Sequence, residues 1–340
     1  AQQKTIETLQ QANPASPPPL PVAKANDATA SDSLFPTTDD SVVVASGNAP
    51  PLIPTTDSTV VATASPEPSL NAPITISSSG KSFLNLSFIG QFSAAASSTD
   101  HLDSLEASDH DPQQNGFNAR NLEIALDGAV DPYFEGYANL VFKLDNNAET
   151  AAEFEEAFLQ TTSLSHGLQV KAGQFFAPLG RINSQHPHVW DFVDGPLMNG
   201  RLMGADGLRG VGAQVSWVAP LPWYSQVIMA VQNGSGGTGY AFRNPGEDGT
   251  FMGRTTIDRP IDGIQDYVFV PRWENSFDLN ANNTVLAGVS AAFGPNDTGP
   301  SARTQTYAAD LLYKWKPSNA EGGWPFVKWQ TEAMVRKFDA

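Results

Sequence analysis

The sequence contains no cysteine, and this absence excludes disulfide bonds and thiolate metal sites. It also contains no run of about 18 apolar residues, so we do not expect a transmembrane helix. The G-x-S-x-G, P-loop and H-E-x-x-H patterns, which mark common hydrolase and nucleotide-binding sites, are all missing. We therefore expect that the protein is not an enzyme.

Basic residues are also scarce. The chain has 19 Lys and Arg against 36 Asp and Glu, which gives a formal net charge of −17. Proteins bind nucleic acid through clustered Lys and Arg, so the composition excludes nucleic acid as a partner. The acidic balance favours cations as partners instead.

Aromatic residues are nearly absent from residues 1–80, which contain twelve Pro and a single aromatic residue, Phe35. Such a segment buries too little apolar surface to offset its conformational entropy, so we expect a disordered periplasmic extension. Within it, residues 4–11 have the apolar spacing of a short helix, which at this length would need a partner chain. The chain begins at Ala1-Gln2-Gln3, as a secreted protein does once its signal peptide has been removed.

From residue 81 onward, apolar residues recur at every second position, which predicts β-strands. Several of these strands are longer than the roughly 5–6 residues of a typical soluble strand. Short turns alternate with long polar loops, which is the pattern of outer-membrane barrels. The eleven candidate strands cover 83–93, 121–127, 134–145, 152–162, 168–176, 208–218, 223–232, 266–279, 284–293, 304–316 and 326–338.

We therefore predict an all-β fold, an antiparallel transmembrane β-barrel of the outer-membrane porin type over residues 81–340, preceded by the disordered extension. A large soluble β-sandwich or β-helix is the alternative. Bacterial single-chain barrels have even strand numbers, and the chain ends at Asp339-Ala340 without a terminal aromatic residue. We expect either that strands are missed within 240–265 or, as the favoured explanation, that the sequence is truncated before the barrel closes.

The polar sides of the strands supply candidate residues for the lumen wall. In the acidic run of the fourth candidate strand, a period of two places Glu153 and Glu155 on one face and Glu156 on the other. Residues 100–111 are also rich in acidic side chains, and we expect them to form a solvated external loop. The lumen-lining candidates are Glu123, Asp127, Glu135, Lys143, Glu153, Glu155 and Arg181.

Residues 177–207 form the polar loop with the highest concentration of candidate ligands, and we expect this loop to fold inward and narrow the lumen. Imidazoles and carboxylates suit zinc or another divalent cation, and His186 and His188 are the metal candidates. Without a metal, the same side chains would hydrogen-bond to the wall and brace the constriction, so no cofactor is required. The candidates at the constriction are His186, His188, Asp191 and Asp194.

Four stretches of the sequence carry a family resemblance. They read NLEIALDGAVDPYFEGYANL (121–140), EFEEAFLQTTSL (153–164), LQVKAGQFFAPLGRINSQHPHVWDFVDGPL (168–197) and Leu221-Pro222-Trp223-Tyr224. On these residues the chain resembles plugless outer-membrane porin-like proteins related to phosphate-selective porins, and is most similar to the branch labelled zinc-regulated TonB-dependent outer-membrane receptors. The resemblance implies an outer-membrane β-barrel of a diderm (Gram-negative) bacterium that passes or captures small solutes.

From this resemblance and the acidic composition we expect a porin-like channel for passive diffusion of small solutes or ions, with a preference for cations. Residues 1–80 are too short and too rich in Pro to be the folded plug of a TonB-dependent receptor, and an acidic chain does not suit phosphate. Expected partners are outer-membrane lipid or lipopolysaccharide, the solutes, and further copies of the chain in a homo-oligomer. The alternatives are a divalent-metal (zinc) uptake receptor and a structural barrel or sheath whose extension binds the cell wall or a periplasmic protein.

Overall fold

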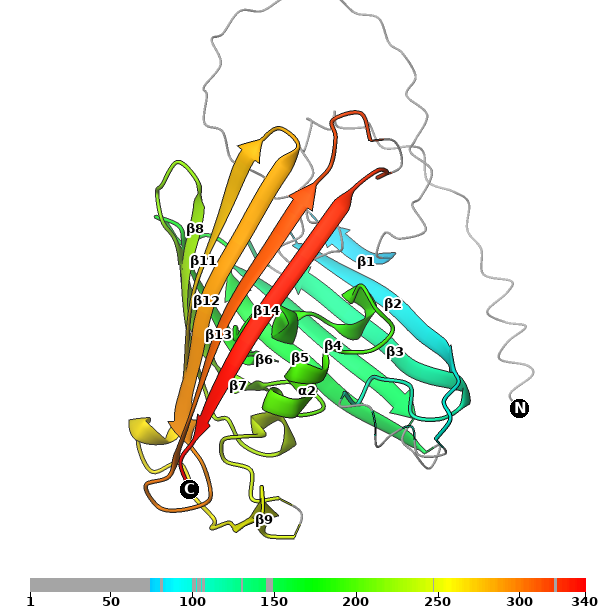
Figure 1. Cartoon of the computed structure of the whole chain (residues 1–340). Helices are drawn as coiled ribbons and strands as arrows, with labels where there is room; N and C mark the ends of the chain where they lie inside the picture. The colour runs from blue at the N-terminus through cyan, green and yellow to red at the C-terminus, as the bar shows by residue number, and fades with distance from the viewer. Residues whose placement is uncertain are drawn as a thin grey trace, which may run out of the picture. The chain divides into compact units, whose positions relative to one another are not determined.

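The strands of the protein form one large antiparallel sheet (Figure 1). The computed structural model describes residues 74–340 apart from 80–81, 100–101, 103–104, 106–107, 130, 145–148, 247 and 321–322. Within this part, twelve strands pair one after another in the order β1-β2-β3-β4-β5-β6-β7-β8-β11-β12-β13-β14. Their bounds are β1 (Ile74–Ser79), β2 (Ser82–Ala95), β3 (Gly116–Ala129), β4 (Phe134–Leu144), β5 (Thr150–Thr161), β6 (Leu168–Phe176), β7 (Arg209–Val218), β8 (Tyr224–Gln232), β11 (Val268–Asn280), β12 (Asn283–Pro295), β13 (Arg303–Trp315) and β14 (Val327–Phe338).

In the described residues, helical structure is confined to short pieces between the strands. No helix in the described part of the chain is long and apolar enough to cross a membrane. A separate two-stranded ribbon lies in the connection between β8 and β11. These minor elements are η2 (Ile182–Ser184), η3 (Pro187–Val189), α2 (Leu197–Met203), η4 (Gly237–Gly239), β9 (Thr250–Phe251), β10 (Arg254–Thr255) and η5 (Ile264–Asp266).

The all-β antiparallel fold expected from the sequence is confirmed, and each of the eleven candidate strands is present in the sheet. The sheet is open, because β1 and β14 are its two edges and do not pair with each other. One boundary was wrong. Ile74–Ser79 forms β1, although the sequence analysis assigned it to the disordered extension; these residues pair with β2 through backbone hydrogen bonds that do not require apolar side chains. The short helix expected over 4–11 lies outside the described residues.

The two faces of the sheet differ in chemistry. We call the face that residues 177–207 cover the inner face, and the opposite one the outer face. Along β13, the inner-face residues Thr304, Thr306 and Asp310 are at most 5% exposed, whereas Tyr307 on the outer face is 46% exposed. The outer face is apolar although it is exposed; among its side chains are Phe88, Phe92, Phe154, Leu159, Val215, Val227, Met229, Trp273, Val289, Trp329 and Val335.

Two β-bulges add polar side chains to the inner face. Asn139 of β4 lies opposite Glu156, but the next residue lies opposite Phe154, so Glu155 is the extra residue of a bulge in β5. A second register shift leaves Arg120 as the extra residue of β3. A bulge interrupts the alternation of faces, so two consecutive residues point the same way. The bulge in β5 lies where His186 contacts the wall, and Arg120 at the bulge in β3 donates to the carbonyl oxygen of His110.

Residues 177–207 lie across the inner face and contact both flanks of the sheet (Figure 1). On one flank, the Gly180 amide donates to Ser290 Oγ of β12 over 2.8 Å, and the Ile182 amide donates to Glu332 Oε2 of β14 over 3.2 Å. On the other flank, His186 contacts Glu155 of β5. The segment is therefore fixed at both ends of its path across the sheet.

Gly180 permits the close approach to β14. Its φ angle is +68°, a backbone conformation that residues with a side chain rarely adopt. A Cβ atom at this position would lie 1.8 Å from Glu332 Oε1. Its carbonyl also accepts a hydrogen bond from Arg272 Nη1 over 2.9 Å. The backbone itself is therefore part of the anchor on this flank.

A buried ion pair stabilises the same anchor. Arg272 donates to both carboxylate oxygens of Asp310, over 2.7 and 3.1 Å, and Arg181 Nε donates to the same group over 3.3 Å. The Asp310 side chain is fully buried and pairs with both guanidinium groups, and Arg272 also pairs with Glu274 over 3.0 Å.

We predict that Asp310→Asn destabilises the protein by about 3–5 kcal/mol, because the change removes the buried negative charge that the Arg181 and Arg272 guanidinium groups share. The free energy of unfolding in urea, measured in detergent, checks this. Asp278→Asn, at an exposed position near the end of β11, is the control and should change stability by less than about 0.5 kcal/mol. Equal effects of the two substitutions on the free energy of unfolding would contradict the stabilising role of Asp310.

Candidate functional site

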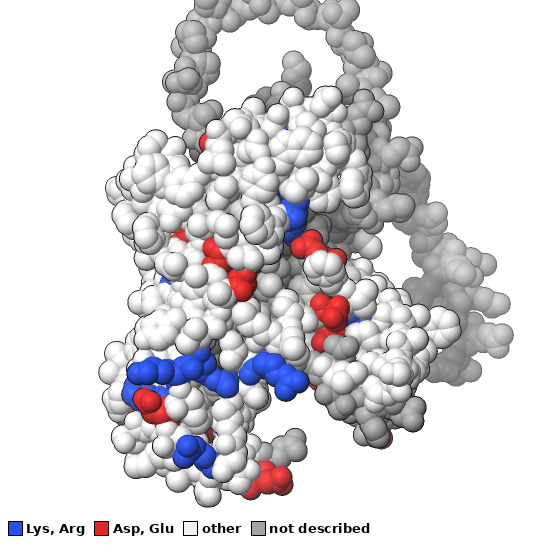
Figure 2. All heavy atoms as spheres, in the orientation of Figure 1, with Lys and Arg blue, Asp and Glu red and all other residues white. Residues whose placement is uncertain are grey.

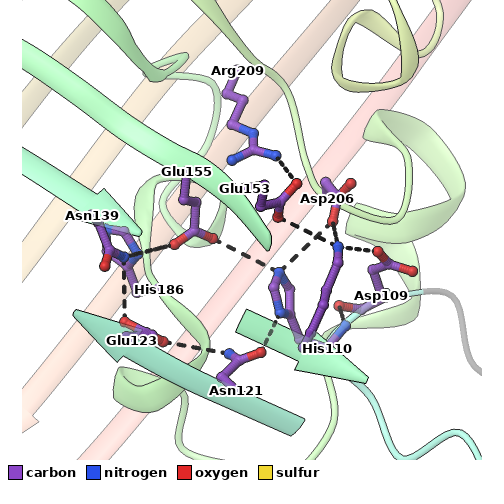
Figure 3. A network of polar contacts seen from close by, with 12 residues as sticks. Asp109, His110, Asn121, Glu123, Asn139, Glu153, Glu155, His186, Asp206 and Arg209 are labelled. Atoms are coloured by element: carbon purple, nitrogen blue, oxygen red, sulfur yellow. Dashed lines mark hydrogen bonds and ion pairs between the residues drawn. The ribbon is translucent and has the colours of Figure 1, made fainter. Parts of the chain in front are cut away.

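The inner face of β3, β4 and β5 holds a polar network that is buried around Glu155 and continues into the adjoining loops, where Asp109 is exposed (Figure 3). Two groups of side chains make up most of it, and His110 lies between them. We define the Glu155 set as Glu123, Asn139, Glu155 and His186. We define the Lys143 set as Asp109, Lys143, Glu153 and Asp206.

His186 is the contribution of the 177–207 loop to the Glu155 set. Its Nδ1 lies 2.7 Å from Glu155 Oε2 and its Nε2 lies 3.0 Å from Glu156 Oε2, so both ring nitrogens face carboxylates. Its ring stacks on His188 with 5.6 Å between centroids and an interplanar angle of 18°. His188 Nδ1 in turn lies 3.0 Å from Glu123 Oε2.

The pKa of His186 follows from these contacts. Burial opposes the charged form of the ring, but the carboxylates of Glu155 and Glu156 outweigh it and raise the pKa well above the ordinary 6.5. His186 is therefore a buried imidazolium at neutral pH when no other cation is bound.

The Lys143 set already contains its own cation. Lys143 Nζ contacts Asp109, lies 3.1 Å from Asp206 Oδ1 and lies 3.4 Å from Glu153 Oε1. Arg209 Nη2 pairs with the other oxygen of Glu153 over 3.0 Å. This set ties the loop residue Asp206 to the strands, as Figure 3 shows.

His110 lies between the two sets. Its Nδ1 is 2.7 Å from Asn121 Oδ1, and its Nε2 is 3.8 Å from both Glu155 Oε1 and Asp206 Oδ1. A cavity of about 40 Å³ opens beside His110, Glu155 and Asp206 and is large enough for water or a small ion. This cavity therefore leaves room for a water molecule beside a histidine and two carboxylates.

The structure brings together only part of the ligand group expected in residues 177–207. His186 and His188 stack on each other and meet carboxylates, but these carboxylates come from the strands. Asp191 and Asp194 are exposed, and Asp191 pairs with Lys328 of β14 over 2.9 Å. Placing the four as one ligand group was therefore wrong, because η3 turns the chain after Pro187 and directs the aspartates elsewhere.

The lumen-lining candidates fall into three places. Glu123, Lys143, Glu153 and Glu155 all belong to the buried network. Arg181 lies on the opposite flank, paired with Asp310. Two others lie further along the inner face and stay partly exposed: Asp127, which accepts from Asn85 Nδ2 over 2.9 Å, and Glu135.

Sequence reasoning placed two features wrongly and missed others. Glu156 shares the inner face with Glu155, because the bulge in β5 breaks the period of two. His110 and Asp111 are 4% and 2% exposed, so this end of the acidic run packs inward and is not a solvated loop. Asn139 and Asp206 were missed, because neither belongs to a local cluster of ligand types.

Comparison with known proteins gives a similarity in sequence but no family. No family model matches the sequence. The chain is 34% identical over 213 residues to an uncharacterised protein of Aquifex aeolicus (strain VF5). The alignment includes 60% of this chain and 42% of that protein, so the chain spans less than half of its relative's length. The similarity carries no function, and the porin-like resemblance remains a prediction.

We predict that His186→Gln destabilises the metal-free protein most strongly at low pH. A raised pKa in the folded state gives stability that is fully present below about pH 6.5 and falls as the pH rises through the raised value. Urea unfolding from pH 5.5 to 9 in the presence of a chelator should therefore show a difference from wild type that shrinks with pH. His166→Gln, at an exposed turn, is the control. If His186→Gln differs from wild type in stability by the same amount at every pH, the raised pKa of His186 is contradicted.

Proposed function

We propose that this chain forms the wall of an outer-membrane, porin-like channel that passes small solutes or ions by diffusion and favours cations. The observation that carries the proposal is the opposite chemistry of the two faces. An exposed face that is apolar across eleven strands needs a nonpolar surrounding, whereas the inner face carries buried charges and a folded-in loop.

The dimensions of the strands support a membrane location. From β2 to β14 the strands of the main sheet are 9–14 residues long, and a tilted strand needs about 9–11 residues to cross a bilayer. Exposed aromatic residues near the strand ends suit the interfaces between lipid and water. They include Tyr133, Trp217, Trp223 and Trp324.

The charges on the wall support a preference for cations. The inner face of β3–β5 carries two basic side chains, Arg120 and Lys143, and a larger number of carboxylates. Fixed negative charge beside a narrow aqueous path raises the local concentration of cations. In Figure 2 acidic side chains lie across the middle of the face shown, with Lys and Arg gathered below them. The carboxylates on this wall are Glu123, Asp127, Glu135, Glu153, Glu155 and Glu156.

The anchored loop supports passive diffusion through a constriction. Residues 177–207 are fixed to both flanks of the inner face, so they would narrow the path permanently. Outer-membrane lipid and the diffusing ions are the partners of this function, which needs neither a cofactor nor an enzymatic site. A role as a structural sheath is the competing proposal, and an absence of conductance would favour it.

We predict that the double substitution Asp127→Asn and Glu135→Gln lowers the cation preference, because both carboxylates are partly exposed on the inner face. The reversal potential under a salt gradient in a planar bilayer measures this, and it should move towards zero. Asp248→Asn, at an exposed position in the β8–β11 connection, is the matched control and should leave it unchanged. An anion preference of the wild type would contradict the proposal.

A further inference from the structure

Four potential metal ligands from four different elements converge at the Glu155 set. Glu123 belongs to β3, Asn139 to β4, Glu155 to β5 and His186 to the 177–207 loop. The ligand atoms of the two glutamates and the histidine all lie within 4.8 Å of one another, and all three residues are buried. One ion could therefore contact the wall and the loop at once.

His186 is oriented as metal-binding histidines are. Its Nδ1 faces the other donors of the set, and its Nε2 lies 3.0 Å from Glu156 Oε2, outside the set. A ligating histidine usually donates its second ring N–H to a carboxylate, which fixes the ring and raises its basicity. Glu156 is in position for this role, and the bulge in β5 puts it there.

Asn139 gives an independent indication. Its side chain is 0% exposed, its amide points into the set, and its Oδ1 has no hydrogen-bond partner. Its Nδ2 lies 3.0 Å from Glu155 Oε2 and 3.3 Å from both Glu123 Oε2 and His186 Nδ1. Turning the Asn139 side-chain amide by 180° would exchange its Oδ1 and Nδ2 atoms, so that Oδ1 faces Glu155, Glu123 and His186. These distances match the separation of about 3.3 Å between ligands of a tetrahedral ion with bonds of about 2.0 Å.

The charge of the set is suited to a bound cation. Among the described residues, the ion-pair partners of Glu123 and Glu155 are all histidines. The neighbouring Lys143 set, by contrast, holds the permanent cation of Lys143. A bound divalent ion would take the place of the Nδ1 proton of His186, which would leave as the ion binds.

We propose that Glu123, Asn139, Glu155 and His186 bind one divalent transition-metal ion of the zinc class, which fastens the 177–207 loop to the wall. One imidazole nitrogen with three oxygens suits zinc and its neighbours better than an all-oxygen site would. The site differs from a group formed by His186, His188, Asp191 and Asp194. The metal-site proposal does not depend on the proposed ion conduction, because zinc binding is measured on the detergent-solubilised chain without a membrane.

The test is isothermal titration of the full chain with zinc chloride, after removal of metal by a chelator. We expect one tight zinc ion per chain, and Glu155→Gln should weaken binding at least 100-fold. Glu156→Gln should weaken it roughly 10- to 100-fold through the orientation of His186. Asn139→Asp should tighten it by adding a charged ligand, and this gain cannot come from a failure to fold.

The matched control is Glu153→Gln, which removes a carboxylate of the Lys143 set on the same strand and should leave zinc affinity within about twofold. X-ray absorption of the zinc complex should show nitrogen and oxygen ligands at about 2.0–2.2 Å, with one imidazole. The proposal is overturned if the wild type binds no zinc, if Glu155→Gln and Glu156→Gln bind as the wild type does, or if Glu153→Gln loses affinity equally.

Discussion

The placement of the 177–207 loop on the inner face depends on the need to neutralise buried carboxylates. Asp310 on one flank and Glu155 on the other are both buried, and a buried charge is stable only when a partner neutralises it. Residues 177–207 supply partners to both, through Arg181 and His186. The loop therefore contributes a cation to each flank, beside Arg272 on the Asp310 flank, and it covers the carboxylates that these cations neutralise.

The outer face imposes the complementary requirement. Its exposed aromatic and aliphatic side chains would be costly in water over so many strands, and they become favourable when lipid surrounds them. The same alternation that directs Phe154 outward directs Glu153 and Glu155 inward. One sequence pattern thus produces both the apolar outer face and the charged inner face, and these are the two features on which the proposed channel rests.

Much of the fold could be predicted from the sequence because the period of two is a local signal that long strands repeat many times. The candidate site was less predictable from the sequence. Glu156 was placed on the wrong face because a bulge leaves no mark in the alternation. Asn139 gains its role only from its neighbours in space, on the two adjoining strands and in the 177–207 loop. Asp191 and Asp194 were grouped with the histidines by proximity in sequence, whereas a 3₁₀ turn separates them in space.

The central claim is that the inner face lines an aqueous path and the outer face meets lipid. The most direct test uses the absence of native cysteine, with one cysteine introduced at Asp127 on the inner face or at Phe154 on the outer face. During a single-channel recording, a charged thiol reagent should reduce the conductance of Asp127→Cys and leave Phe154→Cys unchanged. Modification of Phe154→Cys from the aqueous phase, with no effect on Asp127→Cys, would contradict the account.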